Sequence, residues 1–365
     1  MVRDFAENEV RPKLQSIEYE GKFPRDLVKK MAELGLLGLN VSEEYGGAGA
    51  DNVAYSMAIE EISRVSASLA ITMSVNCSVC CFPIFTFGNE EQKRKYLVPC
   101  ARGEMLGGFA LTEPNAGSDA TAQKTSAVRK GDHYIINGTK NWVTNGQEAS
   151  ILILQAMTDP GAGSHGISSF IVETKWPGVK IGRNEPKMGL NGSVTNQIIF
   201  EDVEVPVANR LGDEGIGFKI AMKSLDGGRI GVASQAIGIA RGAYEVSLKY
   251  ARERTAFDQK IVEFQAIQFM LADMAMEIDA ARLLAHQAAV LRDQGKPFTK
   301  IAAMAKLYAS EMANRVTYKA IQIDGGYGYS QEYPVERYYR EARVTTLYEG
   351  TSEIQRIVIA RNVMK

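Results

Sequence analysis

The feature that most constrains this fold is a change of hydrophobic period along the chain, from helical to alternating and back to helical. After Gly215, apolar residues step by three and four along three long segments, the pattern of helices that pack side by side. The stripes are Ile230, Ala233, Ile237, Ala240 and Tyr244; Phe264, Ile267, Leu271, Met274, Ile278, Ala281 and Ala285; and Ala305, Ala309, Met312 and Val316. Residues 215–365 are therefore predicted to form an antiparallel helical bundle of the four-helix type.

Residues 106–214 instead show short alternating runs, such as "HYIINGTKNWV" and "ISSFIVET", separated by Asn-Gly and Pro-Gly pairs. This pattern predicts a small antiparallel β sandwich or barrel. Residues 1–105 have helical runs joined by the glycine-rich connection "SEEYGGAGAD". We therefore expect a mainly α fold with a central β-domain, divided into an N-terminal helical domain (1–105), a β-domain (106–214) and a C-terminal bundle (215–365).

The charge balance gives no general attraction to polyanions. The 365 residues carry 42 basic and 43 acidic side chains, for a net charge of −1. A chain without a global positive field is not expected to bind nucleic acid or an anionic membrane surface.

Four cysteines suggest a metal site at first sight. Cys77, Cys80 and Cys81 lie in an apolar run without a matching second pair, and Cys100 stands apart. Buried thiols in a reducing compartment, with no metal, are the preferred interpretation.

The run from Val65 to Gly88 has no charged residue and is long enough to span a bilayer. It also contains several serines, a threonine, an asparagine and Pro83. We expect a buried helix that lines a cavity, with no membrane insertion.

A letter-for-letter match to the dinucleotide fingerprint G-x-G-x-x-G occurs in "GAGSHG", residues 161–166. That fingerprint functions between a strand and a helix, where glycines let a pyrophosphate approach the helix N-terminus. Here predicted strands stand on both sides, so we interpret the motif as a hairpin loop.

Four other segments each allow two interpretations. The segment "FALTEPNAGSDATA" (109–122) offers hydroxyls and accessible backbone N–H groups for a phosphate or a heteroaromatic edge, or is a solvated turn. In "NWVTNG" (141–146), Trp142 is a core residue or a stacking wall. Cations in "RERTAFDQK" (252–260) favour a helix C-terminus or clamp a pyrophosphate, and the paired glycines of "QIDGGYGY" (322–329) end a helix or admit a phosphate.

The segment "TTLYEGTSEIQRIVIARN" (345–362) contains an acid with no obvious structural purpose. Ser352 and Gln355 suggest a capping box that opens an amphipathic helix. Glu349 precedes the cap, where the helix requires no carboxylate.

Together and in this order, "TEPNAGSD", "WVTNG", "LDGGRIG", "RTAFDQ", "QIDGGYGY" and "YEGTSEIQR" resemble the acyl-CoA dehydrogenase family along the whole chain. The likeness is strongest to the short-chain, butyryl-type members. The resemblance implies an enzyme that uses FAD to convert acyl-CoA thioesters to trans-2-enoyl-CoA.

The resemblance also assigns residues to the cofactor. Residues 109–118 would follow the flavin ring and ribityl chain, and residues 142–144 would cover the ring. Arg254 and Gln265 of one subunit, with residues 322–326 of a neighbour, would hold the adenine dinucleotide end, and residues 351–353 would complete the site. The individual candidates are Phe109, Leu111, Thr112, Gly117, Ser118, Trp142, Val143, Thr144, Arg254, Phe257, Gln265, Gln322, Ile323, Gly325, Gly326, Thr351 and Glu353.

Glu349 matches the family's catalytic base, which removes the α-proton of the thioester. Burial is expected to raise the pKa of this carboxyl towards the working pH. In isovaleryl-type and some long-chain relatives the base stands at a position that aligns with Gly228, which has no side chain here. The candidates for substrate contact are Ser118, Asp226, Gly228, Arg229, Tyr348, Gly350 and Arg361, with weaker support for Ser193.

One residue departs from the family pattern. Asp324 is acidic where an apolar or neutral residue is commoner, close to the expected position of a pyrophosphate.

The resemblance implies acyl-CoA as substrate, electron-transfer flavoprotein as electron acceptor and a homotetramer, because the flavin is shared between subunits. An acyl-CoA oxidase that uses oxygen, or a non-dehydrogenating flavin- or nucleic-acid-binding relative, are the alternatives. The absence of a transit segment favours the bacterial cytoplasm, with the mitochondrial matrix as the alternative.

Overall fold

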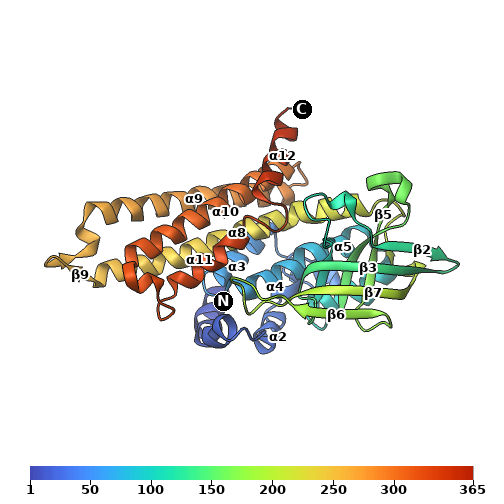
Figure 1. The fold of residues 1–365 in the computed structure, drawn as a ribbon, viewed down its shortest axis with the longest axis horizontal. Coiled ribbons are helices and arrows are strands. Elements are labelled where there is room, and N and C mark those ends of the chain that lie inside the picture. Colours follow the sequence, from blue (N-terminus) through green and yellow to red (C-terminus); the bar gives the residue numbers. More distant parts are fainter. Residues whose placement is uncertain (365) are drawn as a thin grey trace.

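Three long helices run side by side through the computed structural model, which describes residues 1–364 (Figure 1). They are α8 (Gly217–Glu253), α9 (Gln265–Asp293) and α10 (Thr299–Asp324). Most residues of the three predicted stripes are buried between them, while Tyr244, Phe264 and Ile267 pack at the edge of the same core. The shorter helix α11 (Val335–Val344) packs against α8 and α10, and α12 (Ser352–Val363) against α10. The predicted helical bundle is confirmed.

The first helical region packs against the same bundle, since α3 and α4 both contact α8. Its helices are α1 (Val2–Phe5), α2 (Arg25–Glu33), α3 (Asn52–Ser63), α4 (Ala67–Val75), α5 (Phe82–Phe87), α6 (Glu90–Gln92) and α7 (Val98–Arg102). Side chains cap three of them. Asp51 accepts a hydrogen bond from the amide of Ala54, Ser66 accepts one from the amide of Leu69, and Asn89 accepts one from the amide of Gln92. These caps fix where α3, α4 and α6 begin.

The uncharged run forms α4, a π-helical turn (Asn76–Cys81) and α5 in succession. Ala67–Phe87 is long and apolar enough to cross a membrane by length and composition, but 83% of its apolar window is buried inside the protein. The core helix of a soluble protein has the same properties, and this helix contacts α3, α8 and β1.

The β-domain is one curved sheet at the other end of the molecule from the hairpin of β9 (Thr255–Ala256) and β10 (Gln259–Lys260) (Figure 1). Its main order is β6-β7-β3-β2-β4-β5-β8. The strands are β1 (Gly107–Ala110), β2 (Ser126–Lys130), β3 (His133–Thr144), β4 (Ile151–Met157), β5 (Ile167–Glu173), β6 (Val179–Asn184), β7 (Thr195–Pro206) and β8 (Arg210–Leu211).

Most strand pairs are antiparallel, as predicted, but two are not. β1 pairs with β4 in parallel, and β2 meets β4 through one parallel pair, Ser126 with Met157. The segment "GAGSHG" lies in the connection between β4 and β5, so the hairpin-loop interpretation is confirmed.

All four cysteines are buried and free. Within residues 1–364, no group of three or more His, Cys, Asp or Glu side chains could hold a metal ion.

Candidate active site

Glu349 lies in the loop between α11 and α12, with its carboxylate against α8. Its Oε2 atom is shielded from solvent and has no hydrogen-bond partner among the described residues. Burial raises the pKa of Glu349 to about 7, against the opposing influence of the Lys306 and Arg229 cations. The carboxyl therefore exchanges a proton near neutral pH, as a general base requires.

The backbone of this loop is strained where the acid stands. Glu349 has φ 52° and Gly350 has φ 92°, so two successive residues occupy the left-handed region. A non-glycine residue rarely adopts this conformation, and such residues are concentrated at functional sites.

One face of α8 lacks side chains where polar groups approach it. A β-carbon at Gly228 would lie 2.1 Å from Oε2 of Glu349, and one at Gly231 would lie 2.4 Å from Oγ of Ser74. A β-carbon at Gly227 would lie 2.5 Å from Nη1 of Arg292. This glycine face allows the Glu349 carboxylate to lie directly on the helix, beside Gly228.

Neighbouring candidates belong to the same region. Arg229 donates a hydrogen bond to Asp226, whose other oxygen accepts one from Thr299 at 2.7 Å. The hydroxyl of Tyr348 donates to Gln235, whose amide donates to the carbonyl of Ala67 at 3.0 Å. Asp226, Arg229 and Tyr348 are thus fixed on or beside α8, whereas Arg361 is exposed on the last turn of α12.

The β-domain candidates meet at the end of β3. The amide of Asn141 donates to the carbonyl of Thr112 at 2.8 Å, which brings the loop after β1 beside Trp142. Trp142 is 60% exposed and has φ 60°. An exposed indole on a strained backbone fits a stacking surface better than a core position, which answers the question that the sequence left open.

A buried ion pair anchors this loop. Lys140 donates to Glu113 at 2.9 Å and to the carbonyl of Leu111 at 2.9 Å. Glu113 also accepts the amide hydrogens of Lys124 and Thr125. The anchor leaves Gly117 and Ser118 exposed at the tip of a fixed loop.

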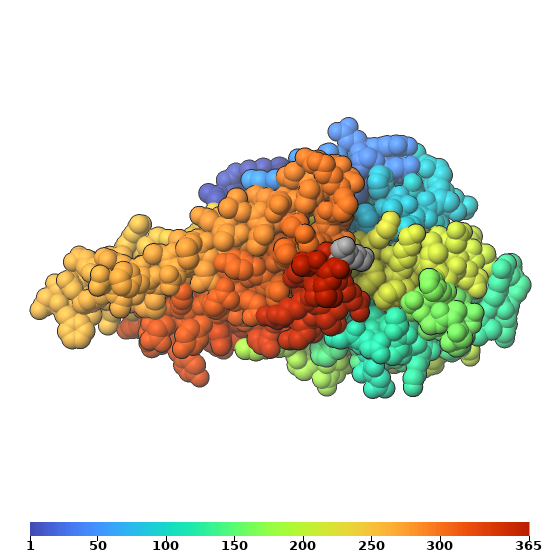
Figure 2. Space-filling view, turned by 90° about the horizontal axis from the view of Figure 1, so that it is seen from above, coloured from blue at the N-terminus to red at the C-terminus, as the bar shows by residue number. Residues whose placement is uncertain are grey.

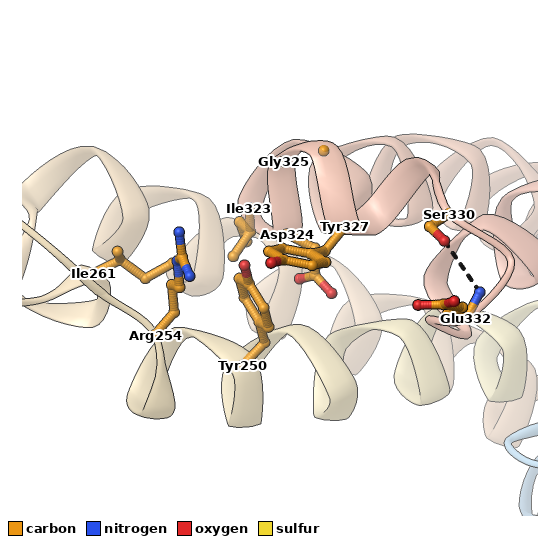
Figure 3. Close-up of a pocket in the computed structure, with 10 residues that line it drawn as sticks. Tyr250, Arg254, Ile261, Ile323, Asp324, Gly325, Tyr327, Ser330 and Glu332 are labelled. Atoms are coloured by element: carbon orange, nitrogen blue, oxygen red, sulfur yellow. Dashed lines mark hydrogen bonds between the residues drawn. The ribbon is translucent and has the colours of Figure 1, made fainter.

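A second candidate region lies at the far end of α8, where a cavity of about 560 Å³ opens (Figure 3). Its lining includes Tyr250 and Arg254, the last two residues of α10 (Ile323 and Asp324) and the glycines that follow them (Gly325 and Gly326). A β-carbon at Gly325 or Gly326 would meet nothing within 4 Å, so the backbone there is accessible to a ligand. An arginine facing exposed backbone suits a pyrophosphate.

Arg254 and residues 323–326 line the same cavity of a single chain. The resemblance implied that they come from two subunits, and this arrangement does not require that division. Phe257, Gln265 and Gln322 are exposed beside this region and do not line the cavity. Phe257 and Asp258 form the tip of the β9–β10 hairpin with φ 51° and 63°, and Phe257 is 90% exposed.

The capping residue of α12 is corrected. Thr351, rather than Ser352, is the N-cap, and its side chain accepts a hydrogen bond from the amide of Ile354. Ser352 is the first helical residue and is buried.

Sequence reasoning missed Lys306 and Gln355, which hold the Glu349 loop. Lys306 donates to the carbonyl of Gly350 at 2.7 Å, and Gln355 donates to the carbonyls of Glu349 and Gly350 at 3.1 and 2.9 Å. The sequence feature that could have indicated Lys306 is a lysine next to the alanine stripe of α10, at a position where an apolar residue is expected.

Asp324 is 2% exposed, and neither carboxylate oxygen has a hydrogen-bond partner among the described residues. Burial raises the pKa of Asp324 to about 6. In Figure 3 its carboxylate lies below the ring of Tyr327, on the side of α8.

We expect Asp324→Asn to remove a pH-dependent cost to stability. Between about pH 4 and 6 the unfolded chain loses this proton while the folded chain keeps it, so wild-type stability falls as the pH rises, and the cost persists above pH 6. The unfolding free energy of the variant apoprotein, relative to the wild type, should rise by about 1 to 3 kcal/mol between pH 4 and pH 7. A difference that does not change with pH would contradict this assignment.

Three family models match the chain in succession. They are described as the acyl-CoA dehydrogenase N-terminal domain (1–104), middle domain (108–203) and C-terminal domain (215–364). The chain belongs to the acyl-CoA dehydrogenase family.

Several similar proteins within the family are short-chain enzymes. The short-chain specific acyl-CoA dehydrogenase of Clostridium acetobutylicum is 49% identical over 365 residues, covering 100% of this chain and 96% of that one. The butyryl-CoA dehydrogenase structure from Megasphaera elsdenii is 47% identical with a TM-score of 0.98, covering 100% and 96%. A chain from a structure described as the electron transferring flavoprotein of Acidaminococcus fermentans is 52% identical with a TM-score of 0.99, covering 100% and 96%.

The chain is therefore an oxidoreductase of an FAD-dependent family, and it resembles the short-chain members. Its structure fits that cofactor at two places. The exposed Trp142 beside the Thr112 loop suits a flavin ring, and the cavity of Arg254, Gly325 and Gly326 suits a pyrophosphate.

Proposed function

We propose that this protein catalyses the α,β-dehydrogenation of short-chain acyl-CoA thioesters to trans-2-enoyl-CoA, with Glu349 as the α-proton acceptor. The observation that carries the proposal is the Glu349 carboxylate, which is unpartnered at Oε2, set against Gly228 and has a pKa of about 7. Because Gly228 carries no side chain, no second carboxylate competes for this position.

The protein's own residues act on the substrate proton. With its pKa raised to about 7, Glu349 is ionised in part at neutral pH, and the carboxylate takes the proton from Cα of the thioester. Bound FAD would accept the hydride from Cβ. The cations Arg229 and Lys306 lower the pKa of Glu349, so its carboxylate is less basic than burial alone would make it.

The residues that would hold FAD lie far apart in one chain. α8 has 37 residues, and most of its length separates Gly228 from Arg254. The separation of these two residues along the helix axis is about 39 Å. Trp142 lies in the β-domain, at the opposite end of the molecule from β9 (Figure 1). One FAD molecule cannot reach both regions, which supports a flavin site completed by the Arg254 cavity of a second copy.

An exposed apolar stripe on α9 supports the homotetramer. Phe269, Met276, Leu283 and Val290 recur every seven residues, and each is at least 41% exposed. Figure 2 shows this part of the chain, in orange, extending as a narrow arm from the molecule. A heptad of exposed apolar side chains suits packing against a helix of another copy.

We expect Leu283→Glu to dissociate the oligomer, because Leu283 is 72% exposed at the centre of the stripe and a buried carboxylate would lack a partner there. Sedimentation should show a smaller species that has lost FAD. The control is Glu263→Gln, on the turn that precedes α9. If the Leu283→Glu variant remains an intact oligomer, the interface between copies does not include this stripe.

The finer features of this proposal come from the family resemblance and from similar proteins. We propose electron-transfer flavoprotein as the acceptor, supported by the similar chain in the Acidaminococcus structure. We propose the bacterial cytoplasm as the location, supported by the Clostridium relative, and a protein that neither binds nucleic acid nor inserts in a membrane. The proposed cofactor and substrate contacts are those assigned from the sequence, except for the division of Arg254 from residues 323–326.

The test is anaerobic mixing of the purified protein with acyl-CoA thioesters of increasing length, followed by flavin absorbance. We expect a yellow protein with one FAD per chain that is bleached fastest by butyryl- to hexanoyl-CoA. A colourless protein that cannot bind FAD would overturn the whole proposal, and faster bleaching by a twelve-carbon thioester would overturn only the chain length. Rapid recovery of colour with oxygen, without electron-transfer flavoprotein, would indicate the oxidase.

A further inference from the structure

We propose that Lys306 is a positioning residue, which holds the Glu349 carboxylate over the glycine face of α8 through its hydrogen bond to the Gly350 carbonyl. This inference rests on the proposed function, because it concerns the same acid. It concerns a residue on α10 that touches neither the acyl chain nor the cofactor in the assignments above.

The geometry gives Lys306 a single hydrogen-bond partner. Its side chain is fully buried, and its only hydrogen bond among the described residues is the 2.7 Å contact with the Gly350 carbonyl. A buried ammonium without an opposite charge in contact is costly, so its position needs a reason other than solubility.

The backbone that Lys306 holds does not keep its shape by itself. Glu349 at φ 52° lies in the left-handed region, where the backbone of a non-glycine residue is strained. Lys306 and Gln355 both donate to the Gly350 carbonyl, from α10 and α12 respectively. Two fully buried donors on separate helices fix the loop in the strained conformation that directs Glu349 towards Gly228.

The charge of Lys306 also supports Glu349 as a base, because the cation stabilises the ionised form of the carboxyl. Burial lowers the pKa of Lys306 to about 8, so the ammonium form still predominates at pH 7. That cation lowers the pKa of Glu349 against the effect of burial. Loss of the cation should therefore make Glu349 hold its proton to higher pH.

The other charged groups around Glu349 are few. Arg229 on α8 also favours its ionised form. The hydroxyls of Tyr55 on α3 and of Tyr348 stay neutral, since burial raises the pKa of both. Glu311 on α10 and Glu353 on α12 act on Lys306 and favour its charged form.

The test compares Lys306→Met with the wild type and with Lys300→Met, an exposed lysine on the same helix. We expect Lys306→Met to bind FAD and butyryl-CoA normally, and to lose about 10- to 100-fold in the rate of flavin bleaching, because the base is no longer held in place. The acid limb of its pH–rate profile should move to higher pH, which a loss of folded protein alone would not cause. Lys300→Met should show neither change.

A second variant separates the charge from the hydrogen bond. Lys306→Gln retains a donor towards Gly350 without the cation. The acid limb of its pH–rate profile should therefore move to higher pH, with a smaller loss of rate than in Lys306→Met. This variant also tests the proposal if Lys306→Met does not fold. Wild-type rates and an unmoved acid limb in either folded variant would overturn the positioning assignment, whereas absence of bleaching in the wild type would overturn the proposed function itself.

Discussion

Replacing Glu349 with glutamine is expected to lower the rate of flavin bleaching by butyryl-CoA at least about a thousandfold, or roughly 4 kcal/mol of transition-state stabilisation. Glutamine has nearly the same shape and cannot accept the α-proton. FAD content and binding of butyryl-CoA should stay close to normal, because the Gly350 carbonyl still accepts hydrogen bonds from Lys306 and Gln355. Anaerobic stopped-flow absorbance measures the rate, and Glu33→Gln, at the exposed end of α2, is the control.

The glycine face of α8 provides a further check on this assignment. A carboxylate at Gly228 would point at the same place, but its β-carbon would overlap the end of the residue 349 side chain. Gly228→Glu should therefore restore part of the activity best on a Glu349→Ala background, where that space is free. Near-normal turnover of Glu349→Gln would exclude Glu349 as the base, whereas failure of the rescue alone would reject only the Gly228 geometry.

The second large effect concerns stability. Arg337 is 1% exposed on α11 and donates to both carboxylate oxygens of Glu341, at 2.8 and 3.1 Å. Glu18, equally buried, lies near this pair and accepts hydrogen bonds from Ser66 and Ser68. Arg337→Met would remove the buried cation that lies beside these two carboxylates, so we expect a loss of about 3 to 5 kcal/mol in unfolding free energy.

A solvent-exposed pair with the same spacing gives the control. Arg94 donates to Glu90 at 2.6 Å, and their side chains are 51% and 58% exposed. Arg94→Met should cost less than about 1 kcal/mol, the usual value of such pairs. Urea unfolding of the two variants measures the difference. Equal losses would show that burial does not determine the effect.

The long helices were predictable because their information is local. The stripe from Ala305 to Val316 repeats at the helical spacing, and each of its members is buried. The parallel pairing of β1 with β4 was not predictable, because residues 107–110 find partners at 151–154, and the local sequence does not specify such distant pairing. Similarly, Thr351 and Ser352 are adjacent hydroxyl residues, and only the backbone conformation decides which one caps α12.

The candidate site likewise contains residues that the sequence could predict and residues that it could not. Glu349 could be found from the sequence because the helix that follows it has no use for its carboxylate. For Lys306 the sequence shows only a lysine beside the alanine stripe of "AAMAKLYAS". It does not show the partner, the Gly350 carbonyl, which lies 44 residues away along the chain. Asp324 was noticed as a departure, but its lack of hydrogen-bond partners depends on how α10 packs against α8.

The length of α8 has a genetic consequence. If each flavin site combines the Glu349 region of one chain with the Arg254 cavity of another, every chain contributes half of two different sites. A chain carrying Glu349→Gln and a chain carrying Arg254→Ala would each be inactive alone. In a mixed pair, one site receives both lesions and the other receives neither. Two defective alleles expressed together would then complement each other, so that the severity of a substitution depends on which partner allele accompanies it.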